Sequence, residues 1–226
     1  MSVVHVVILE NYSSSEGPEV SQRIPSEQCY LTLKAAGYQS VLIASSNDQT
    51  GRGADSFDGQ FSQVMRSASG LDCLAELSRR FTWDDSDIIV CLDDDKALFQ
   101  LEWIKRLIQA ARTKPEADII TLALSADGAK FDSGEVKVIT DKAKYALLFS
   151  RAFIPFDRNG NAVSRNLVIC PTTLCHVNFY ATRVNTIKNL GNTEVSPLER
   201  VEQCDLLRAL SNGYRIQVAT VDEAEL

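Results

Sequence analysis

Apolar residues recur along the chain with two spacings, and each spacing predicts a different element. Continuous apolar runs of strand length, rich in Val, Ile and Leu, predict buried strands over residues 3–9, 40–44, 87–92 and 118–124. Apolar residues spaced three and four apart predict amphipathic helices over residues 26–37, 69–81 and 98–112. The alternation of strands and helices predicts an α/β fold, and its opening strand–helix–strand unit predicts a parallel sheet.

The pattern changes in the second half of the chain. Residues 134–139 and 145–149 predict a hairpin, and an extended arm follows to Pro155. Further strands are predicted over residues 176–183 and 215–221. Between them, Ser196-Pro-Leu-Glu199 is typical of a helix start with a capping box, and that helix is predicted to continue to Asn212. The whole pattern predicts one domain over residues 1–226 with a mixed, mainly parallel sheet.

Composition and charge exclude several classes of function. Hydrophobic residues make up 45% of the 226 residues and charged residues 23%, as in ordinary globular proteins. The net charge of −7 argues against nucleic-acid binding, which needs a basic face. The apolar runs are too short to span a membrane, and no signal peptide is expected at the N-terminus.

Six cysteines raise the question of a metal site or disulfides. No two of them form a Cys-x-x-Cys pair, and the chain has only two histidines, so a zinc site would lack ligands. Buried thiols in a reducing cytoplasm are the expected state. We therefore expect a cytoplasmic protein without structural zinc.

An acidic run, Asp93-Asp94-Asp95, follows the predicted strand 87–92 directly. Ligands of open α/β sheets bind beyond the carboxyl ends of the strands, and carboxylate oxygens suit Mg²⁺. The same run is also typical of a solvated acidic turn ahead of a helix, whose N-terminus favours negative charge. The residues alone leave both interpretations open.

An ordered series of motifs covers residues 134–220. In sequence these are Val136-Lys-Val138, Tyr145-Ala-Leu147, Phe149-Ser-Arg-Ala152, Ile154-Pro155, His176, Tyr180-Ala-Thr-Arg183, Ser196-Pro-Leu-Glu199, Leu207-Arg-Ala-Leu210 and Gly213. In this order and spacing the chain resembles the CMP-Kdo synthetases, the 3-deoxy-manno-octulosonate cytidylyltransferases. The resemblance extends more weakly over residues 1–125.

The resemblance implies a fold, a reaction and a set of site residues. The fold is the Rossmann-like nucleotidyltransferase (nucleotide-diphospho-sugar transferase) fold, in a homodimer formed partly through a 134–160 arm. The reaction is Mg²⁺-assisted transfer of a cytidylyl group from CTP to a 3-deoxy sugar acid. On the sugar-acid side the matching residues are Arg151, His176, Ser196 and Glu199. The nucleotide-binding positions are Ser69 and Gly70, and the metal-binding carboxylates are Asp95 and Asp222.

Three of these residues also have plain structural interpretations. His176 is equally consistent with a hydrogen-bonded histidine that supports the fold. Arg151 needs a carboxylate partner, which is either a substrate acid or an Asp or Glu of a dimer partner. Glu199 is explained by the capping box without any ligand.

The loop after the first strand departs from the family pattern. The family places a Pro-Ala-Arg motif, a second Arg and a Lys there to hold the triphosphate, whereas Arg23 is the only Lys or Arg before Lys34 in this chain. Carboxylates occupy the same region at Glu10, Glu16, Glu19 and Glu27. In addition, Cys73 replaces a family Arg. Because carboxylates repel a triphosphate, we expect CTP chemistry to be altered or lost while a small carboxylate or sugar acid still binds. The alternative is a catalytically inactive pseudoenzyme that serves as a dimer partner or binding module.

Overall fold

The computed structural model describes residues 2–10, 26–45, 60–63, 69–93, 100–125, 134–156, 158 and 173–221. The chain divides into two compact units. Unit 1 comprises Met1–Thr113 and Phe179–Thr193, and unit 2 comprises Lys114–Asn178 and Glu194–Leu226. None of the helices in the described ranges is long and apolar enough to cross a membrane.

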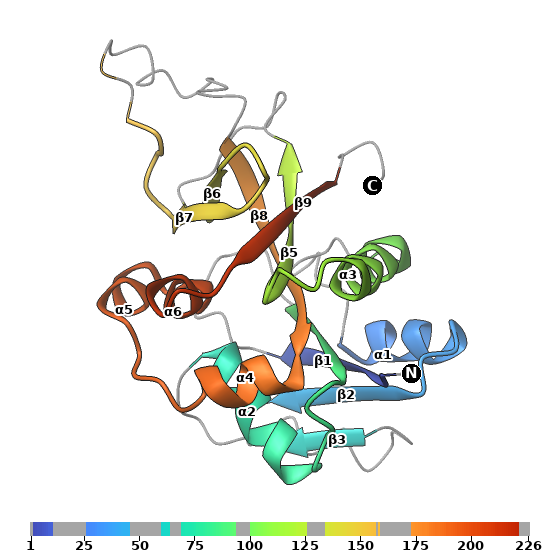
Figure 1. The fold of residues 1–226 in the computed structure, drawn as a ribbon. Coiled ribbons are helices and arrows are strands. Elements are labelled where there is room, and N and C mark those ends of the chain that lie inside the picture. Colours follow the sequence, from blue (N-terminus) through green and yellow to red (C-terminus); the bar gives the residue numbers. More distant parts are fainter. Residues whose placement is uncertain are drawn as a thin grey trace. The chain divides into compact units, whose positions relative to one another are not determined.

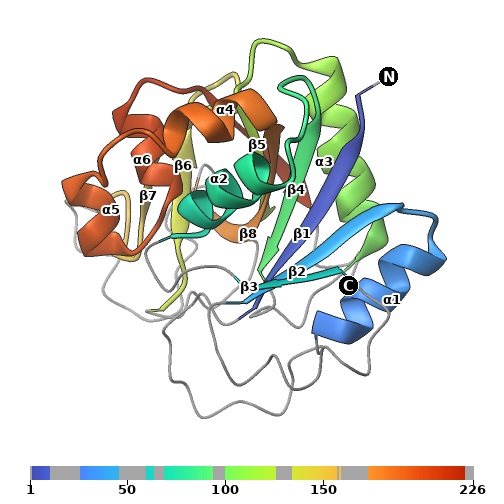
Figure 2. The ribbon, with the colours of Figure 1, turned by 90° about the horizontal axis from the view of Figure 1, so that it is seen from below.

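Unit 1 is built on a parallel sheet in the order β3-β2-β1-β4; Figure 1 labels β3, β2 and β1, and Figure 2 labels all four strands. Its strands are β1 (Val4–Glu10), β2 (Ser40–Ser45), β3 (Gln60–Gln63) and β4 (Ile88–Asp93). The second half of β8 (Thr173–Arg183) extends this sheet and pairs with β4 in antiparallel register, from Ile88 opposite Arg183 to Leu92 opposite Phe179. All six residues of β4 are buried, as expected for a central strand with both faces covered.

Helices cover both faces of this sheet. They are α1 (Ser26–Ala35), α2 (Gly70–Arg80), α3 (Leu101–Thr113) and α4 (Val184–Leu190). Figure 2 shows α1 and α3 on one face and α2 and α4 on the other. Trp103, Ile104 and Leu107 of α3 are completely buried, which matches the predicted amphipathic pattern. Helix α4 packs closely on α2 because Gly191 has no side chain; a Cβ there would overlap the Cβ of Ala75.

Unit 2 combines a parallel pair with an antiparallel hairpin. β5 (Ile119–Ser125) pairs in parallel with β9 (Ile216–Val221). β6 (Lys137–Thr140) and β7 (Ala146–Ser150) form the hairpin, and β6 also pairs with the first residues of β8. Two short helices, α5 (Pro197–Glu202) and α6 (Leu206–Ser211), precede β9. The predicted α/β fold with a mixed, mainly parallel sheet is therefore confirmed.

The single helix predicted from Ser196 to Asn212 is wrong. The helix breaks at Gln203, which adopts the left-handed conformation with φ 49° and ψ 49°. A left-handed residue is a common way to end a helix, but glycine usually occupies it, so the sequence gives no warning here. The break frees the carbonyl groups of Glu202 and Gln203, and the side chain of Arg151 binds both.

Candidate functional site

Strands β1 and β4 of unit 1 end at one edge of the sheet, and each is followed in sequence by a predicted site segment. In the register of β1 and β4, Leu9 lies opposite Asp93, so both strands end at the same level. The predicted triphosphate loop follows β1 in sequence, and the acidic run continues past Asp93. The loop itself and Asp95 lie outside the described residues. The two strands thus end at the edge where ligands of such sheets bind.

The predicted magnesium ligands remain predictions. Asp95 and Asp222 both lie outside the described residues, Asp95 beyond the end of β4 and Asp222 directly after Val221, where β9 ends. Within the described ranges, no group of three His, Cys, Asp or Glu residues could hold a metal ion. A magnesium site would therefore depend on carboxylates in segments that the structure does not describe.

Ser69 and Gly70 lie at the start of α2. Ser69 is the N-cap, and the carboxylate of Asp72 accepts hydrogen bonds from its backbone N–H at 3.3 Å and from its hydroxyl at 3.2 Å. A negative side chain of the protein thus already occupies the positive end of this helix. Cys73, at the position where the family carries Arg, is only 4% exposed. This position therefore contributes a buried thiol and no positive charge.

The guanidinium group of Arg151 is held by backbone carbonyl groups. Its Nε donates to the carbonyl of Glu202 at 2.8 Å, its Nη2 donates to that of Gln203 at 3.4 Å, and its Nη1 donates to that of Gly134. The carboxylate of Glu202 in turn accepts from the backbone N–H of Arg151 at 2.7 Å and from the hydroxyl of Ser150 at 2.5 Å. Arg151 thus fixes the carbonyl end of α5, where the helix dipole favours a cation.

His176 is buried in unit 2, with 2% of its surface exposed. Its Nε2 lies 2.8 Å from the hydroxyl oxygen of Thr121 on β5, and the ring of Phe149 meets it edge-on at 5.0 Å. These contacts agree with the structural interpretation of His176. A role in substrate binding stays a prediction.

Ser196 and Glu199 form the predicted capping box. The backbone N–H of Glu199 donates to the Ser196 hydroxyl at 3.1 Å, and the Ser196 N–H donates to the Glu199 carboxylate at 3.3 Å. Arg208 of α6 adds two further bonds to that carboxylate, from Nε at 2.8 Å and from Nη2 at 2.6 Å. Glu199 is 5% and Arg208 is 1% exposed, so this is a buried, two-pronged ion pair that joins α5 to α6.

Two buried cations, Arg208 and Lys137, entered the sequence analysis only as members of family motifs and were given no role of their own there. Arg208 lies among Leu206, Leu207 and Ala209 in an apolar stretch, and a buried arginine in such a stretch needs an acidic partner. That signal was present in the sequence, although it does not identify the partner. Lys137 is 1% exposed, and its Nζ donates to the carbonyls of Glu135 at 2.8 Å and Arg151 at 2.9 Å. No pattern in the sequence indicates that this lysine is buried.

Comparison with known proteins identifies the family of this chain. Residues 30–216 match the family described as cytidylyltransferase. The chain belongs to the cytidylyltransferase family. The 3-deoxy-manno-octulosonate cytidylyltransferases of Francisella philomiragia subsp. philomiragia and of Idiomarina loihiensis are each 30% identical to it over 223 residues, which cover 95% of this chain and 88% of theirs. The resemblance to CMP-Kdo synthetases is confirmed.

Solved structures confirm the nucleotidyltransferase fold. The structure of CMP:2-keto-3-deoxy-manno-octonic acid synthetase complexed with CTP matches with a TM-score of 0.76 and 25% identity, over 98% of this chain and 90% of that one. The bifunctional IspDF of Campylobacter jejuni matches with a TM-score of 0.58 and 15% identity, over 98% of this chain and 50% of that one, and supports the fold alone. The cytidylyltransferase family match begins at residue 30, after the predicted triphosphate loop.

Proposed function

We propose that this cytidylyltransferase-family protein binds a small carboxylate or sugar acid, and that its CTP chemistry is altered or lost. The observation that carries the proposal is the charge of residues 10–25, which run from the last residue of β1 to the residue before α1. Arg23 is the only Lys or Arg among them, and carboxylates stand at Glu10, Glu16 and Glu19. A triphosphate is bound by cations and N–H donors, and carboxylates at those positions repel it. The buried Cys73 at the start of α2 supports the same conclusion.

The sugar-acid part of the proposal is supported by the relatives. They are named as 3-deoxy-manno-octulosonate cytidylyltransferases, and they align with nearly the whole chain. Asp95 and Asp222 would hold Mg²⁺ if the metal step is retained, and the metal would offset charge on the transferring phosphate. The chain's own task in such a transfer is to position the acceptor hydroxyl in line with the α-phosphate.

Titration with each substrate separately tests the proposal. Calorimetry with 3-deoxy-manno-octulosonate should give saturable binding, whereas CTP with Mg²⁺ at millimolar concentration should raise the melting temperature little. With the sugar acid and CTP present together, no pyrophosphate should be released. The Francisella philomiragia relative under the same conditions is the positive control. Pyrophosphate release at a rate comparable to that of the relative would contradict the altered chemistry. Replacing Glu16 and Glu19 by lysine should strengthen CTP binding if the loop charges are the cause.

A second candidate function is a pseudoenzyme that acts as a dimer partner. The observation that favours it is that Arg151, His176, Ser196 and Glu199 all have partners within unit 2. The predicted dimerisation arm also exposes apolar side chains, with Leu147 at 61%, Phe153 at 56% and Phe156 at 89%. Exposed apolar residues clustered along one segment are typical of an interaction surface.

Light scattering combined with ligand titration separates the two candidates. A pseudoenzyme should form a dimer that the double substitution of Phe153 and Phe156 by serine dissociates, and it should bind neither CTP nor the sugar acid. A dimer that binds the sugar acid favours the first proposal. We also propose that the protein resides in a reducing cytoplasm, which is supported by the burial of the five described cysteines, Cys29, Cys73, Cys91, Cys175 and Cys204.

A further inference from the structure

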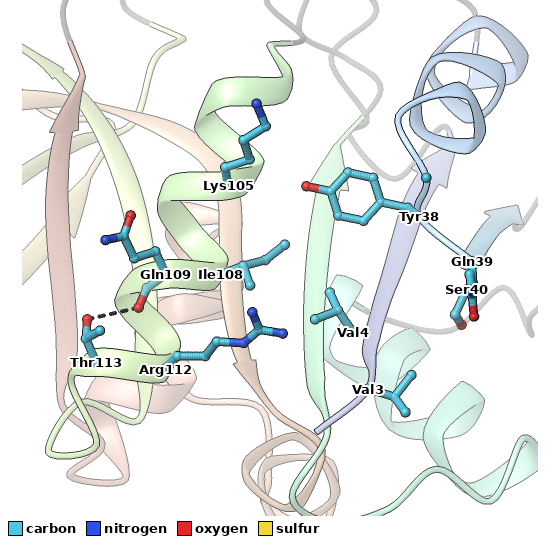
Figure 3. Close-up of a pocket in the computed structure, with 11 residues that line it drawn as sticks. Val3, Val4, Tyr38, Gln39, Ser40, Lys105, Ile108, Gln109, Arg112 and Thr113 are labelled. Atoms are coloured by element: carbon cyan, nitrogen blue, oxygen red, sulfur yellow. Dashed lines mark hydrogen bonds between the residues drawn. The ribbon is translucent and has the colours of Figure 1, made fainter. Parts of the chain in front are cut away.

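A pocket of about 590 Å³ opens at the edge of the unit 1 sheet opposite the carboxyl ends of β1 and β2 (Figure 3). It lies between the amino ends of β1 and β2, where Val4 and Ser40 begin these strands, and one face of α3. β1 is seven residues long, so the pocket is roughly 20 Å from the carboxyl end of this strand. Its volume is that of ordinary small-molecule sites, which are about 300–1,000 Å³.

The charge of this pocket contrasts with that of the chain. Eleven residues of the described chain line it, and they include Lys105 and Arg112 but no Asp or Glu, whereas the whole chain has a net charge of −7. The two cations are seven positions apart on α3, which places them on one helix face about 10 Å apart along the axis. Ile108 and Gln109 lie between them on that face, and Figure 3 shows Lys105 and Arg112 extending toward the pocket.

Neither Lys105 nor Arg112 forms an ion pair with a buried carboxylate among the described residues. The side chain of Arg112 makes no hydrogen bond or ion pair with the described residues. Lys105 pairs with Glu102 at 3.2 Å, but the two side chains are 62% and 63% exposed, and pairs of this kind contribute little. Both positive groups are therefore available to an anionic ligand.

The rest of the pocket wall consists of apolar side chains and of two hydroxyl groups, those of Tyr38 and Ser40. Val4 and Ile108 supply apolar area, and Tyr38 places its ring beside them (Figure 3). Burial raises the pKa of Tyr38, against the opposing charges of Lys105 and Arg112, so its phenol stays protonated and can donate at neutral pH. Ser40 contributes a hydroxyl group whose orientation is fixed by a hydrogen bond to His5.

His5 connects Ser40 to a buried carboxylate. Its Nδ1 lies 2.7 Å from the Ser40 Oγ, its Nε2 lies 3.2 Å from Asp87, and its ring stacks on Trp83 at 4.2 Å. The backbone N–H of Val3 also donates to Asp87, at 2.7 Å. Because a carboxylate only accepts, Nε2 of the neutral ring carries the proton and Nδ1 accepts from Ser40. The Ser40 oxygen is thus held in place as an acceptor in the pocket wall.

We propose that this pocket is a second ligand site, which binds a small amphiphilic organic anion. Lys105 and Arg112 bind its phosphate or carboxylate group, and Val4, Ile108 and Tyr38 contact its apolar or aromatic body. The pairing of two cations with an apolar wall favours amphiphilic anions. A free inorganic anion makes no contact with the apolar wall, and a neutral aromatic molecule leaves the two cations without a counter-charge. The site is separate from the nucleotide edge and does not depend on the proposed function.

Calorimetry with phenyl phosphate, at low ionic strength, tests the proposal. We expect saturable binding that is at least about tenfold tighter than that of inorganic phosphate or benzyl alcohol, which each retain one half of the ligand. Arg112→Gln and Lys105→Gln should each weaken binding by about tenfold. Arg80→Gln, which removes an exposed arginine of α2 outside the pocket, is the matched control and should bind like the unchanged protein.

Gln109→Glu gives a second and independent test. Gln109 is exposed and lines the pocket, so this change adds a negative charge without disturbing the core, and it should also weaken binding. Unchanged melting temperatures would verify that the variants fold. Absence of saturable binding up to roughly 10 mM phenyl phosphate overturns the proposal. Binding that the pocket variants leave unchanged assigns the ligand to another site and overturns it equally.

Discussion

Arg112 in unit 1 and Arg208 in unit 2 both belong to helices with apolar neighbours, but their guanidinium groups have different surroundings. Arg208 is 1% exposed and donates two bonds to the carboxylate of Glu199. Arg112 is exposed beside a pocket, and its side chain makes no hydrogen bond or ion pair with the described residues. The comparison teaches that a cation in an apolar helix pattern can stabilise the fold or remain available to a ligand. Which role it takes depends on tertiary partners.

The largest effect is expected from Arg208→Met. This substitution leaves the Glu199 carboxylate buried without its counter-charge, which should lower the free energy of unfolding by about 3–5 kcal/mol. Urea denaturation measures the loss. Replacing Glu199 by Met as well should recover much of it, because the uncompensated charge is then removed.

Arg80→Met serves as the control for that experiment. Arg80 pairs with Glu76 at 2.7 Å on α2, but its side chain is 47% exposed, so the loss should stay below about 1 kcal/mol. Equal losses at Arg80 and Arg208 would show that burial does not distinguish the two pairs.

A smaller effect is expected from Arg151→Met. The substitution removes the donors to the carbonyls of Glu202, Gln203 and Gly134, and it should cost about 1–3 kcal/mol of stability in the same denaturation assay. Arg151→Lys should restore little, because an ammonium group lacks the guanidinium fork. Unchanged stability together with lost sugar-acid binding would instead assign Arg151 to the ligand.

His5 should make stability depend on pH. Burial lowers the pKa of His5 below its ordinary value of 6.5, although Asp87 acts in the opposite direction. The unfolded chain then takes up the proton more readily than the folded one, so stability is present above about pH 6.5 and is lost as the pH falls toward the lower folded value. Unfolding free energies at about pH 7.5 and about pH 5.5 should differ less in His5→Gln than in the unchanged protein. An equal difference in both would contradict this assignment.

The smallest effect is expected from Lys105→Met. Its pair with Glu102 is exposed, so removing it should change stability by about 0.5 kcal/mol or less. A melting curve measures this. A loss of stability comparable to that of Arg208→Met would mean that the pocket cations stabilise the fold. The proposed difference between the cations of unit 1 and those of unit 2 would then be wrong.

The strands could be predicted from the sequence wherever a short, continuous apolar run is typical of a strand buried on both faces. β1, β2, β4 and β5 all begin and end within one residue of their predicted ranges. β3 was missed because Gln60-Phe-Ser-Gln63 is polar, and α4 was missed because its N-cap is Arg183, which is no typical capping residue. Local patterns therefore predict elements that are buried on both faces better than short or weakly capped ones.

The candidate site shows the same limit. The capping box of Ser196 and Glu199 could be predicted because all its contacts lie within one helical turn. The partners Thr121 of His176 and Arg208 of Glu199 come from other elements, so spacing along the chain does not identify them. The pocket of unit 1 has the same origin, because its walls join the first strands to α3.

The order of strands in unit 1 has a consequence for the newly made chain. β4 is wholly buried in the finished fold, yet its partner segment, Phe179–Arg183, emerges from the ribosome only after the whole of Lys114–Asn178. At roughly 5–20 residues per second, translation leaves that edge of β4 unpaired for several seconds. Unpaired edges invite pairing with other chains, so the nascent protein is most prone to aggregation during this interval.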